Sequence, residues 1–109
     1  MSKKRAPRAP SHLRTDTRKW FTGILENYEL ESHHVKLLTL AAECWDRIVQ
    51  AREQIKVDGL FLRDRYGSMK AHPGVKVEID NKIAFARLVR ELGFDLESRG
   101  DTNRPPRLY

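Results

Sequence analysis

Large apolar side chains recur at helical spacing in three segments of the chain, and more polar stretches separate these segments. The first segment, residues 15–28, has one apolar face formed by Trp20, Phe21, Ile24, Leu25 and Tyr28. Such a face predicts a helix that packs against a neighbour along one side. The hydroxyl side chains of Thr15 and Ser32 are expected to cap this helix and the next one.

The second and third segments predict the two longest helices. Over residues 33–57, apolar side chains at alternating spacings of three and four form a seam of Leu38, Ala41, Trp45, Ile48 and Ile55. Over residues 74–92 there are two apolar stripes: Val75, Ile79, Ile83, Ala86 and Val89, and beside them Phe85, Leu88 and Leu92. Each long helix therefore has more apolar surface than one neighbouring helix would cover.

Residues 60–71 join the two long helices and have a different pattern. Their apolar and polar side chains alternate, and Tyr66-Gly67-Ser68 has the composition of a tight turn, which together predict a small β-hairpin. Gly59 and Gly93 stand where the long helices should end. The predicted fold class is mainly α, an antiparallel helical hairpin with an N-terminal helix and a small β-hairpin between the long helices.

Composition adds an expectation about assembly. The chain has 109 residues, of which 39% are hydrophobic and 8% aromatic, enough for one small domain with a modest core. Apolar faces that exceed such a core predict a homo-oligomer, in the form of a closed ring. The residues expected at the subunit interface are Leu38, Trp45, Ile48, Ile55, Ile79, Phe85 and Leu88.

The net charge of +6 is concentrated at the N-terminus, because residues 1–19 hold seven basic residues and one acidic residue. A basic segment on a neutral body is typical of a protein that binds a polyanion such as DNA, although it can also serve solubility alone. The predicted phosphate contacts are Lys3, Lys4, Arg5, Arg8, Arg14, Arg18 and Lys19, and candidates for site preference are His33, His34 and Lys36.

This charge distribution suggests three regions. Residues 1–14 are predicted to form a basic arm, disordered when unbound, residues 15–97 a helical domain that oligomerises, and residues 98–109 a flexible tail. The N-terminus lacks the apolar core of a secretion signal, and no stretch is apolar enough to cross a membrane. The single cysteine, Cys44, fits a reducing cytoplasm.

Catalytic chemistry finds little support in the sequence. Asp58, Asp64 and His72 could ligate a metal, as in a metal-dependent nuclease, but no metal-binding or nucleotide-binding motif occurs. We therefore expect no enzyme activity, no cofactor and no metal. A small helical DNA-binding regulator is the alternative, because the first two predicted helices resemble a helix-turn-helix, although the second is longer than a recognition helix.

Several short motifs occur in a distinctive order around the predicted hairpin. They are Asp58-Gly59, Tyr66-Gly67, Lys70, His72-Pro73 and Glu91-Leu92-Gly93. With this order and spacing, residues 32–97 resemble the small subunit of tailed-phage terminases. The chain is short for that family, with little sequence after the third helix.

The resemblance implies a function as well as a fold. Small terminase subunits are not enzymes. They assemble into rings in the host cytoplasm, bind double-stranded phage DNA near the packaging site and deliver it to the large terminase subunit, which holds the ATPase and the nuclease. For this chain the resemblance implies those two partners and a helix–hairpin–helix core, and it makes residues 15–97 the domain for DNA packaging and oligomerisation.

Overall fold

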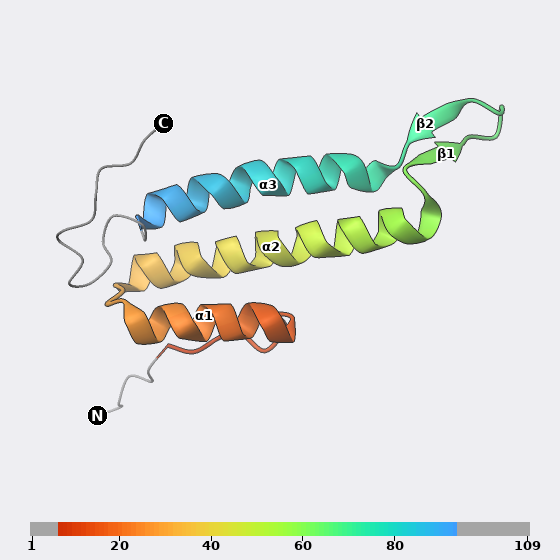
Figure 1. Ribbon diagram of the computed structural model, residues 1–109. Helices are drawn as coiled ribbons and strands as arrows, with labels where there is room; N and C mark the ends of the chain where they lie inside the picture. Colours follow the sequence, from red (N-terminus) through yellow and green to blue (C-terminus); the bar gives the residue numbers. More distant parts are fainter. Residues whose placement is uncertain (1–6, 94–109) are drawn as a thin grey trace, which may run out of the picture.

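Three helices and one small hairpin make up the part of the chain that the computed structural model describes, residues 7–93 (Figure 1). The elements are α1 (Thr15–Asn27), α2 (Ser32–Asp58), β1 (Phe61–Arg63), β2 (Met69–Ala71) and α3 (Pro73–Leu92). The two strands pair antiparallel, with Leu62 opposite Lys70. The predicted fold class, mainly α with a hairpin between the two long helices, is confirmed. None of the helices in residues 7–93 is long and apolar enough to cross a membrane.

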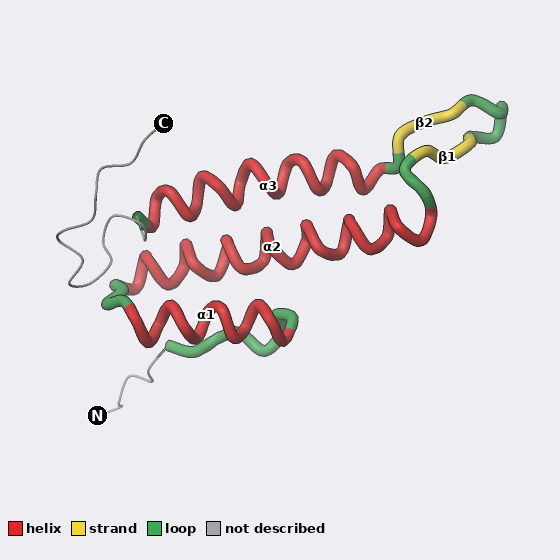
Figure 2. The backbone as a smooth tube through the Cα atoms, viewed as in Figure 1, coloured by secondary structure: helices red, strands yellow, loops and turns green. Residues whose placement is uncertain are grey.

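The helices lie side by side in one layer with α2 in the middle (Figures 1 and 2). Helix α3 runs antiparallel to α2 along most of its length, whereas α1 accompanies only the first half of α2. Among the elements of residues 7–93, the second half of α2 therefore has a helical neighbour on one side alone, and the hairpin projects beyond the ends of both long helices.

The main core lies where all three helices meet. Phe21 and Ile24 of α1 pack there with Leu38 and Ala42 of α2, and Leu92 of α3 closes the cluster. Leu13, which precedes α1, is only 4% exposed and belongs to the same cluster. The predicted boundary at residue 14 thus separates Leu13 from the domain whose core it joins, and residues 7–14 run along α1 (Figure 2).

Both expected helix caps are wrong. Helix α1 begins after Arg14, which makes no side-chain cap hydrogen bond. The capping acceptor comes instead from α2, where the buried Asp46 carboxylate accepts the Arg14 backbone N–H at 2.9 Å and the Thr17 hydroxyl at 2.5 Å. A charged acceptor forms stronger hydrogen bonds than a serine or threonine hydroxyl. Asp46 therefore caps α1 and ties it to α2.

Helix α2 begins with a capping box in which Ser32 plays no part. Glu31 is the N-cap residue, and its side chain accepts a hydrogen bond from the backbone of His34. The Nδ1 atom of His34 in turn accepts the Glu31 backbone N–H at 3.2 Å. A histidine here takes the place of the glutamate or glutamine that usually completes such a box.

Ion pairs join the solvent-exposed edges of α2 and α3. Glu78 of α3 lies 2.7 Å from Lys82 Nζ on its own helix and 3.3 Å from Arg52 Nε on α2. The hydrogen bond from Lys82, followed by that from Arg52, lowers the pKa of the Glu78 carboxyl. Arg52, which lies between Ile48 and Ile55 along the apolar seam of α2, thus connects the two long helices.

Candidate nucleic-acid interface

The structure brings three of the predicted phosphate contacts to one place. Arg8, Arg18 and Lys19 line an open hollow of about 500 Å³ that extends along α1, with Thr15 and Thr22 also in its wall. Glu26 is the acidic residue among the lining side chains. Exposed guanidinium and ammonium groups next to hydroxyl groups can contact the oxygens of a phosphate backbone. The hollow therefore has the chemistry of a nucleic-acid contact.

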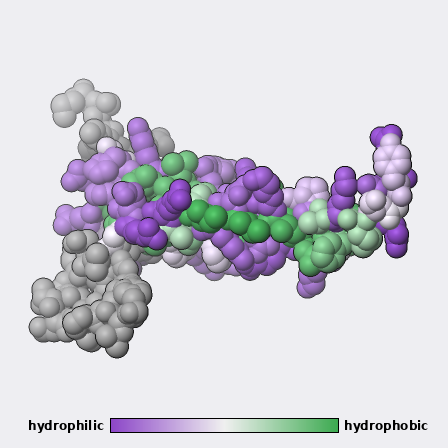
Figure 3. All heavy atoms as spheres, turned by 90° about the horizontal axis from the view of Figure 1, so that it is seen from above, coloured by the Kyte–Doolittle hydropathy of each residue, from purple (hydrophilic) through white to green (hydrophobic). Residues whose placement is uncertain are grey.

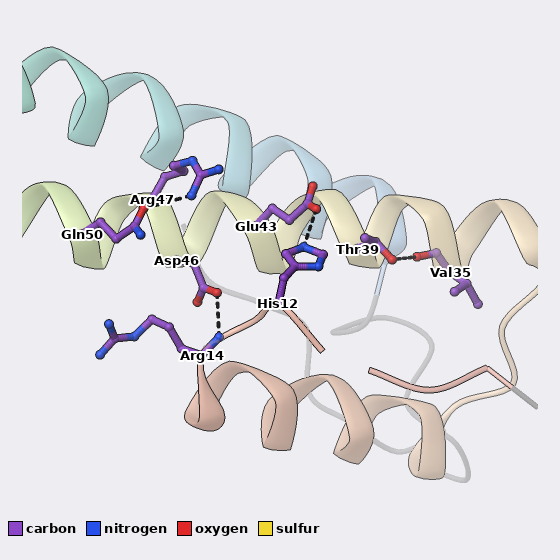
Figure 4. Close-up of polar contacts among 8 residues, drawn as sticks. All are labelled: His12, Arg14, Val35, Thr39, Glu43, Asp46, Arg47 and Gln50. Atoms are coloured by element: carbon purple, nitrogen blue, oxygen red, sulfur yellow. Dashed lines mark hydrogen bonds and ion pairs between the residues drawn. The ribbon is translucent and has the colours of Figure 1, made fainter. Parts of the chain in front are cut away.

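The basic segment before α1 is held in place at several points. Besides burial of Leu13 and the bond from Arg14 N–H to Asp46, His12 Nε2 lies 2.8 Å from Glu43 Oε2 on α2 (Figure 4). The Arg14 guanidinium lies 3.5 Å from Glu53, so its charge is partly balanced within the chain. These contacts fix residues 12–14, and Ala9, which packs against the core cluster, holds the backbone next to Arg8.

The remaining predicted DNA contacts are elsewhere. Lys3, Lys4 and Arg5 lie outside the described residues. His33, His34 and Lys36 lie in the first turns of α2, next to the C-terminal end of α1 rather than its basic start. Arg18 and Lys19 lie eight or nine residues before the end of α1, which is about 12–14 Å of helix, whereas Arg8 also lines a second pocket together with Val35 of α2. His34 is engaged in the helix cap, and His33 Nδ1 is 3.8 Å from Glu31.

The hairpin cations mostly contact the hairpin itself. Arg63 donates to the carbonyl of Gly67 at 3.2 Å, and Lys70 Nζ lies 3.6 Å from Asp64. Asp64 also accepts the backbone N–H groups of Tyr66 and Ser68. Asp64 is therefore the residue that organises the turn, since a carboxylate at this position satisfies backbone donors that would otherwise face solvent.

Asp58 and His72 come together at the base of the hairpin, but as a structural clasp. His72 Nε2 lies 2.9 Å from Asp58 Oδ2, while its Nδ1 accepts the Gly74 backbone N–H at 2.8 Å and caps α3. A side-chain hydrogen bond from Gln54, and then one from His72, lowers the pKa of Asp58. Because its Nδ1 is an acceptor, the ring of His72 donates from Nε2.

Two glycines, Gly59 and Gly74, complete this clasp and lie one and two residues after Asp58 and His72, respectively. Gly59 has φ 92° and ψ 152°, a conformation essentially restricted to glycine, which turns the chain from α2 into β1. A methyl group on Gly74 would approach His72 Nδ1 to 3.1 Å and Ile55 Cγ1 to 3.3 Å. Within residues 7–93 no group of three or more His, Cys, Asp or Glu side chains could hold a metal ion, so Asp64 does not join Asp58 and His72.

The predicted interface residues fall into two groups. Leu38 and Ile48 are fully buried inside the chain, because their positions on α2 face the neighbouring helices. Both are core residues, and their prediction as interface residues is corrected. Trp45 and Ile79 are exposed, while Ile55, Phe85 and Leu88 are partly buried. Seen from the α3 side, apolar residues form a band along the molecule toward the hairpin (Figure 3).

Sequence periodicity did not reveal the aromatic pocket on one face of the layer. Trp20 of α1, Trp45 of α2 and Phe85 of α3 gather there, with ring centroids 6.0 Å apart for Trp20 and Phe85 and 5.3 Å apart for Trp45 and Phe85. With Asp16 and Thr17 these rings line a pocket of about 210 Å³. Each ring belongs to a predicted apolar face, but nothing in the sequence shows that three faces converge.

Comparison with known families gives one match. The family described as "Phage terminase, small subunit" matches residues 19–107, which is 89 of the 109 residues. No curated protein and no solved structure matches this chain. The matched range includes residues 19–27 of α1 and the whole of α2, the hairpin and α3.

Proposed function

Because this chain belongs to the phage terminase small subunit family, we propose that it binds double-stranded phage DNA and presents it to the large terminase subunit during genome packaging. The family acts in phage DNA packaging. The direct grip on DNA, the homo-oligomeric ring and the contact with the large subunit form the proposal, and the host cytoplasm is where these steps would occur. The chain would supply binding and positioning, and the partner subunit the chemistry.

The observation that carries the DNA-binding step is the hollow beside α1. Arg8, Arg18 and Lys19 reach it from two different segments, the chain before α1 and α1 itself. The bonds to Asp46 and the burial of Leu13 fix these two segments relative to each other. Pre-positioned cations lose less conformational freedom on binding than cations on a free arm, which favours phosphate contact.

Assembly would strengthen this grip. The exposed apolar side chains on α3, Val77, Ile79 and Ile83, are consistent with contacts to further copies of the chain. In a ring the basic hollows of several subunits act on one DNA molecule, and linked weak contacts give a much higher overall affinity. Lys3, Lys4 and Arg5 would add non-specific phosphate contacts to each subunit.

The structure decides how the DNA contact should be tested. Deleting residues 1–14 would remove Leu13 from the core and the Arg14 N–H from Asp46, so lost binding could reflect lost folding. The better variant replaces Arg8, Arg18 and Lys19 with glutamine in the full chain. Its matched control replaces Arg47, Lys56 and Arg87, three exposed cations elsewhere, with the same loss of charge.

Affinity for duplex DNA is then measured over a salt series. Each phosphate contact contributes about 0.9 to the slope of log affinity against log salt, so the first variant should lower the slope by up to about 2.7 per subunit. The control variant should keep the slope of the parent chain. If both variants behave alike, the hollow is not the DNA site, and the hairpin cations Arg63, Arg65 and Lys70 become the next to replace.

A further inference from the structure

The β-hairpin presents apolar side chains that residues 7–93 leave largely exposed. Phe61 of β1 is 57% exposed and Met69 of β2 is 56% exposed. The strand register pairs Phe61 with Ala71 and Arg63 with Met69. Directly paired residues, and residues two apart on one strand, share a face of a β-ribbon, so Phe61 and Met69 lie on the same face. This face forms a narrow apolar ridge.

The aromatic pocket formed by Trp20, Trp45 and Phe85 is a concave feature of matching character. It is enclosed by rings from three helices, yet Trp20 and Trp45 keep more than a third of their surface in contact with solvent. Exposed tryptophans in a pocket are the residue type most enriched at the energetic centres of protein interfaces. The pocket therefore has room and surface for an apolar side chain from outside.

A hairpin cannot reach the pocket of its own chain. From Trp45 to the end of α2 at Asp58 there are 13 residues, or about 20 Å of helix. Beyond that point the clasp between Asp58, His72 and Gly74 directs the hairpin away from the helices (Figure 1). The His72 backbone N–H, bonded to the Leu60 carbonyl at 2.8 Å, continues the strand pairing down to this clasp. Only a second chain can bring a hairpin to the pocket.

From this complementarity we infer that the Phe61–Met69 face of one subunit's hairpin inserts into the Trp20–Trp45–Phe85 pocket of the next subunit. The inference rests on the proposed assembly of the chain and names the surfaces that form it. Charge supports the same pairing. Arg63 lies on the same face of the hairpin as Phe61, and Asp16 lines the pocket with a carboxylate that makes no ion pair within residues 7–93. The α3 side chains Ile79 and Ile83 lie along a helix and do not form such a ridge.

A contact of this kind joins two different surfaces of the same chain. Such head-to-tail contacts propagate from subunit to subunit and close into a ring when the rotation between neighbours allows it. This property separates the hairpin contact from a symmetric contact between two α3 helices, which would stop at a dimer. It also makes the two surfaces separable by mutation, because each subunit carries one copy of each.

The test uses two variants of the full chain. Phe61→Glu places a charge on the hairpin and leaves the pocket intact, whereas Trp45→Glu places a charge in the pocket and leaves the hairpin intact. Leu40→Glu, at a half-exposed leucine of α2 away from both surfaces, is the control. Circular dichroism of each variant checks that the helices are retained. The mass of the assembled protein is then measured by light scattering. Tryptophan emission is measured as well, since the pocket contains both tryptophans of the chain.

Each charged variant alone should be monomeric, with its apparent subunit dissociation constant raised at least roughly 30-fold, the effect typical of a central interface residue. The emission of Phe61→Glu should shift to longer wavelength although its mutation is far from both tryptophans. Mixing the two variants should restore one junction, giving a 1:1 heterodimer and no larger species. The Leu40→Glu control should assemble like the parent chain.

The contrary outcomes separate the two proposals. A parent chain that is monomeric at tens of micromolar would overturn the proposed ring and this contact together. An assembled parent chain whose Phe61→Glu variant assembles equally well would overturn the hairpin contact and leave the ring standing on other surfaces. A mixture of the two variants that stays monomeric would show that the hairpin does not enter the pocket.

Discussion

Replacing Asp46 with alanine tests whether this one carboxylate fixes the position of α1. Asp46 is buried and accepts two hydrogen bonds, from the Arg14 backbone N–H and from the Thr17 hydroxyl. Its removal leaves two donors without their acceptor at the start of α1. Buried hydrogen bonds to a charged group contribute about 1.5–3 kcal/mol each, but partial access of water and relaxation of the helix end reduce the sum. We expect Asp46→Ala to lower the free energy of unfolding by about 2–4 kcal/mol.

The assay is urea denaturation followed by circular dichroism, at one fixed subunit concentration because assembly adds to apparent stability. Glu53→Ala is the matched control, since it also removes a carboxylate of α2 near Arg14, but from an exposed pair at 3.5 Å. Exposed ion pairs contribute between about 0 and 1 kcal/mol, so the control should change stability little. Asp46→Asn keeps one acceptor oxygen and should fall between the two.

A double-mutant cycle isolates the contact with the Thr17 hydroxyl. Thr17→Val removes the hydroxyl while keeping the shape of the side chain, and the cost of Asp46→Ala should be smaller in that background. If Asp46→Ala costs no more than Glu53→Ala, Asp46 does not anchor α1, and the position of the basic segment depends on Leu13 packing and the contact between His12 and Glu43. Purely additive effects in the cycle would show that the Thr17 hydroxyl takes no part in the anchor.

Two further predictions concern the hairpin base and the response to pH. Gly74→Ala should destabilise the chain by about 1 kcal/mol because its methyl group crowds the His72 ring, whereas Gly23→Ala, with open space around it, should be neutral or stabilising in the same urea assay. Hydrogen bonds lower the pKa values of Glu78 and Asp58 in the folded chain. Their contribution to the free energy of unfolding is complete above the ordinary pKa values of 4.5 and 3.8, and it is lost as the pH falls through the lower folded-state values. Denaturation midpoints should therefore fall on acidification below about pH 5, and less steeply in Glu78→Gln; an unchanged slope in that variant would contradict the assignment.

The helices and the hairpin were predictable because their causes are local. Apolar periodicity gives the long helices to within a residue or two at each end, and the composition around Gly67 gives the turn. Periodicity also indicated which faces are apolar. It could not divide these faces between the chain's own core and an interface, so Leu38 and Ile48 were placed at an interface although both are buried within the chain.

Contacts between distant parts of the sequence were not predictable in the same way. The caps show this best, because Thr15 has the right chemistry at the right place, and yet the acceptor comes from Asp46, about thirty residues further along the chain. The aromatic pocket likewise requires three helices to be aligned side by side. The clasp of Asp58 and His72 has the residue types of a metal site, and only their bonding partners reveal that they support the backbone.

The flat arrangement of the helices connects stability, assembly and DNA binding. Within residues 7–93 the single layer buries side chains between neighbouring helices, leaves apolar side chains such as Trp45, Val77 and Ile83 exposed, and places no helix on the outer edge of the second half of α2. Association with further copies gives such a domain additional burial, so its denaturation midpoint should rise with subunit concentration. Phe61→Glu should abolish that dependence while leaving each subunit's basic hollow intact, since Arg8, Arg18 and Lys19 lie far from the hairpin. The monomeric variant should therefore bind DNA with the salt slope of one hollow but with much lower affinity, because the loss is one of multivalency. A variant that is monomeric and yet binds DNA as tightly as the parent chain would show that assembly contributes nothing to the grip.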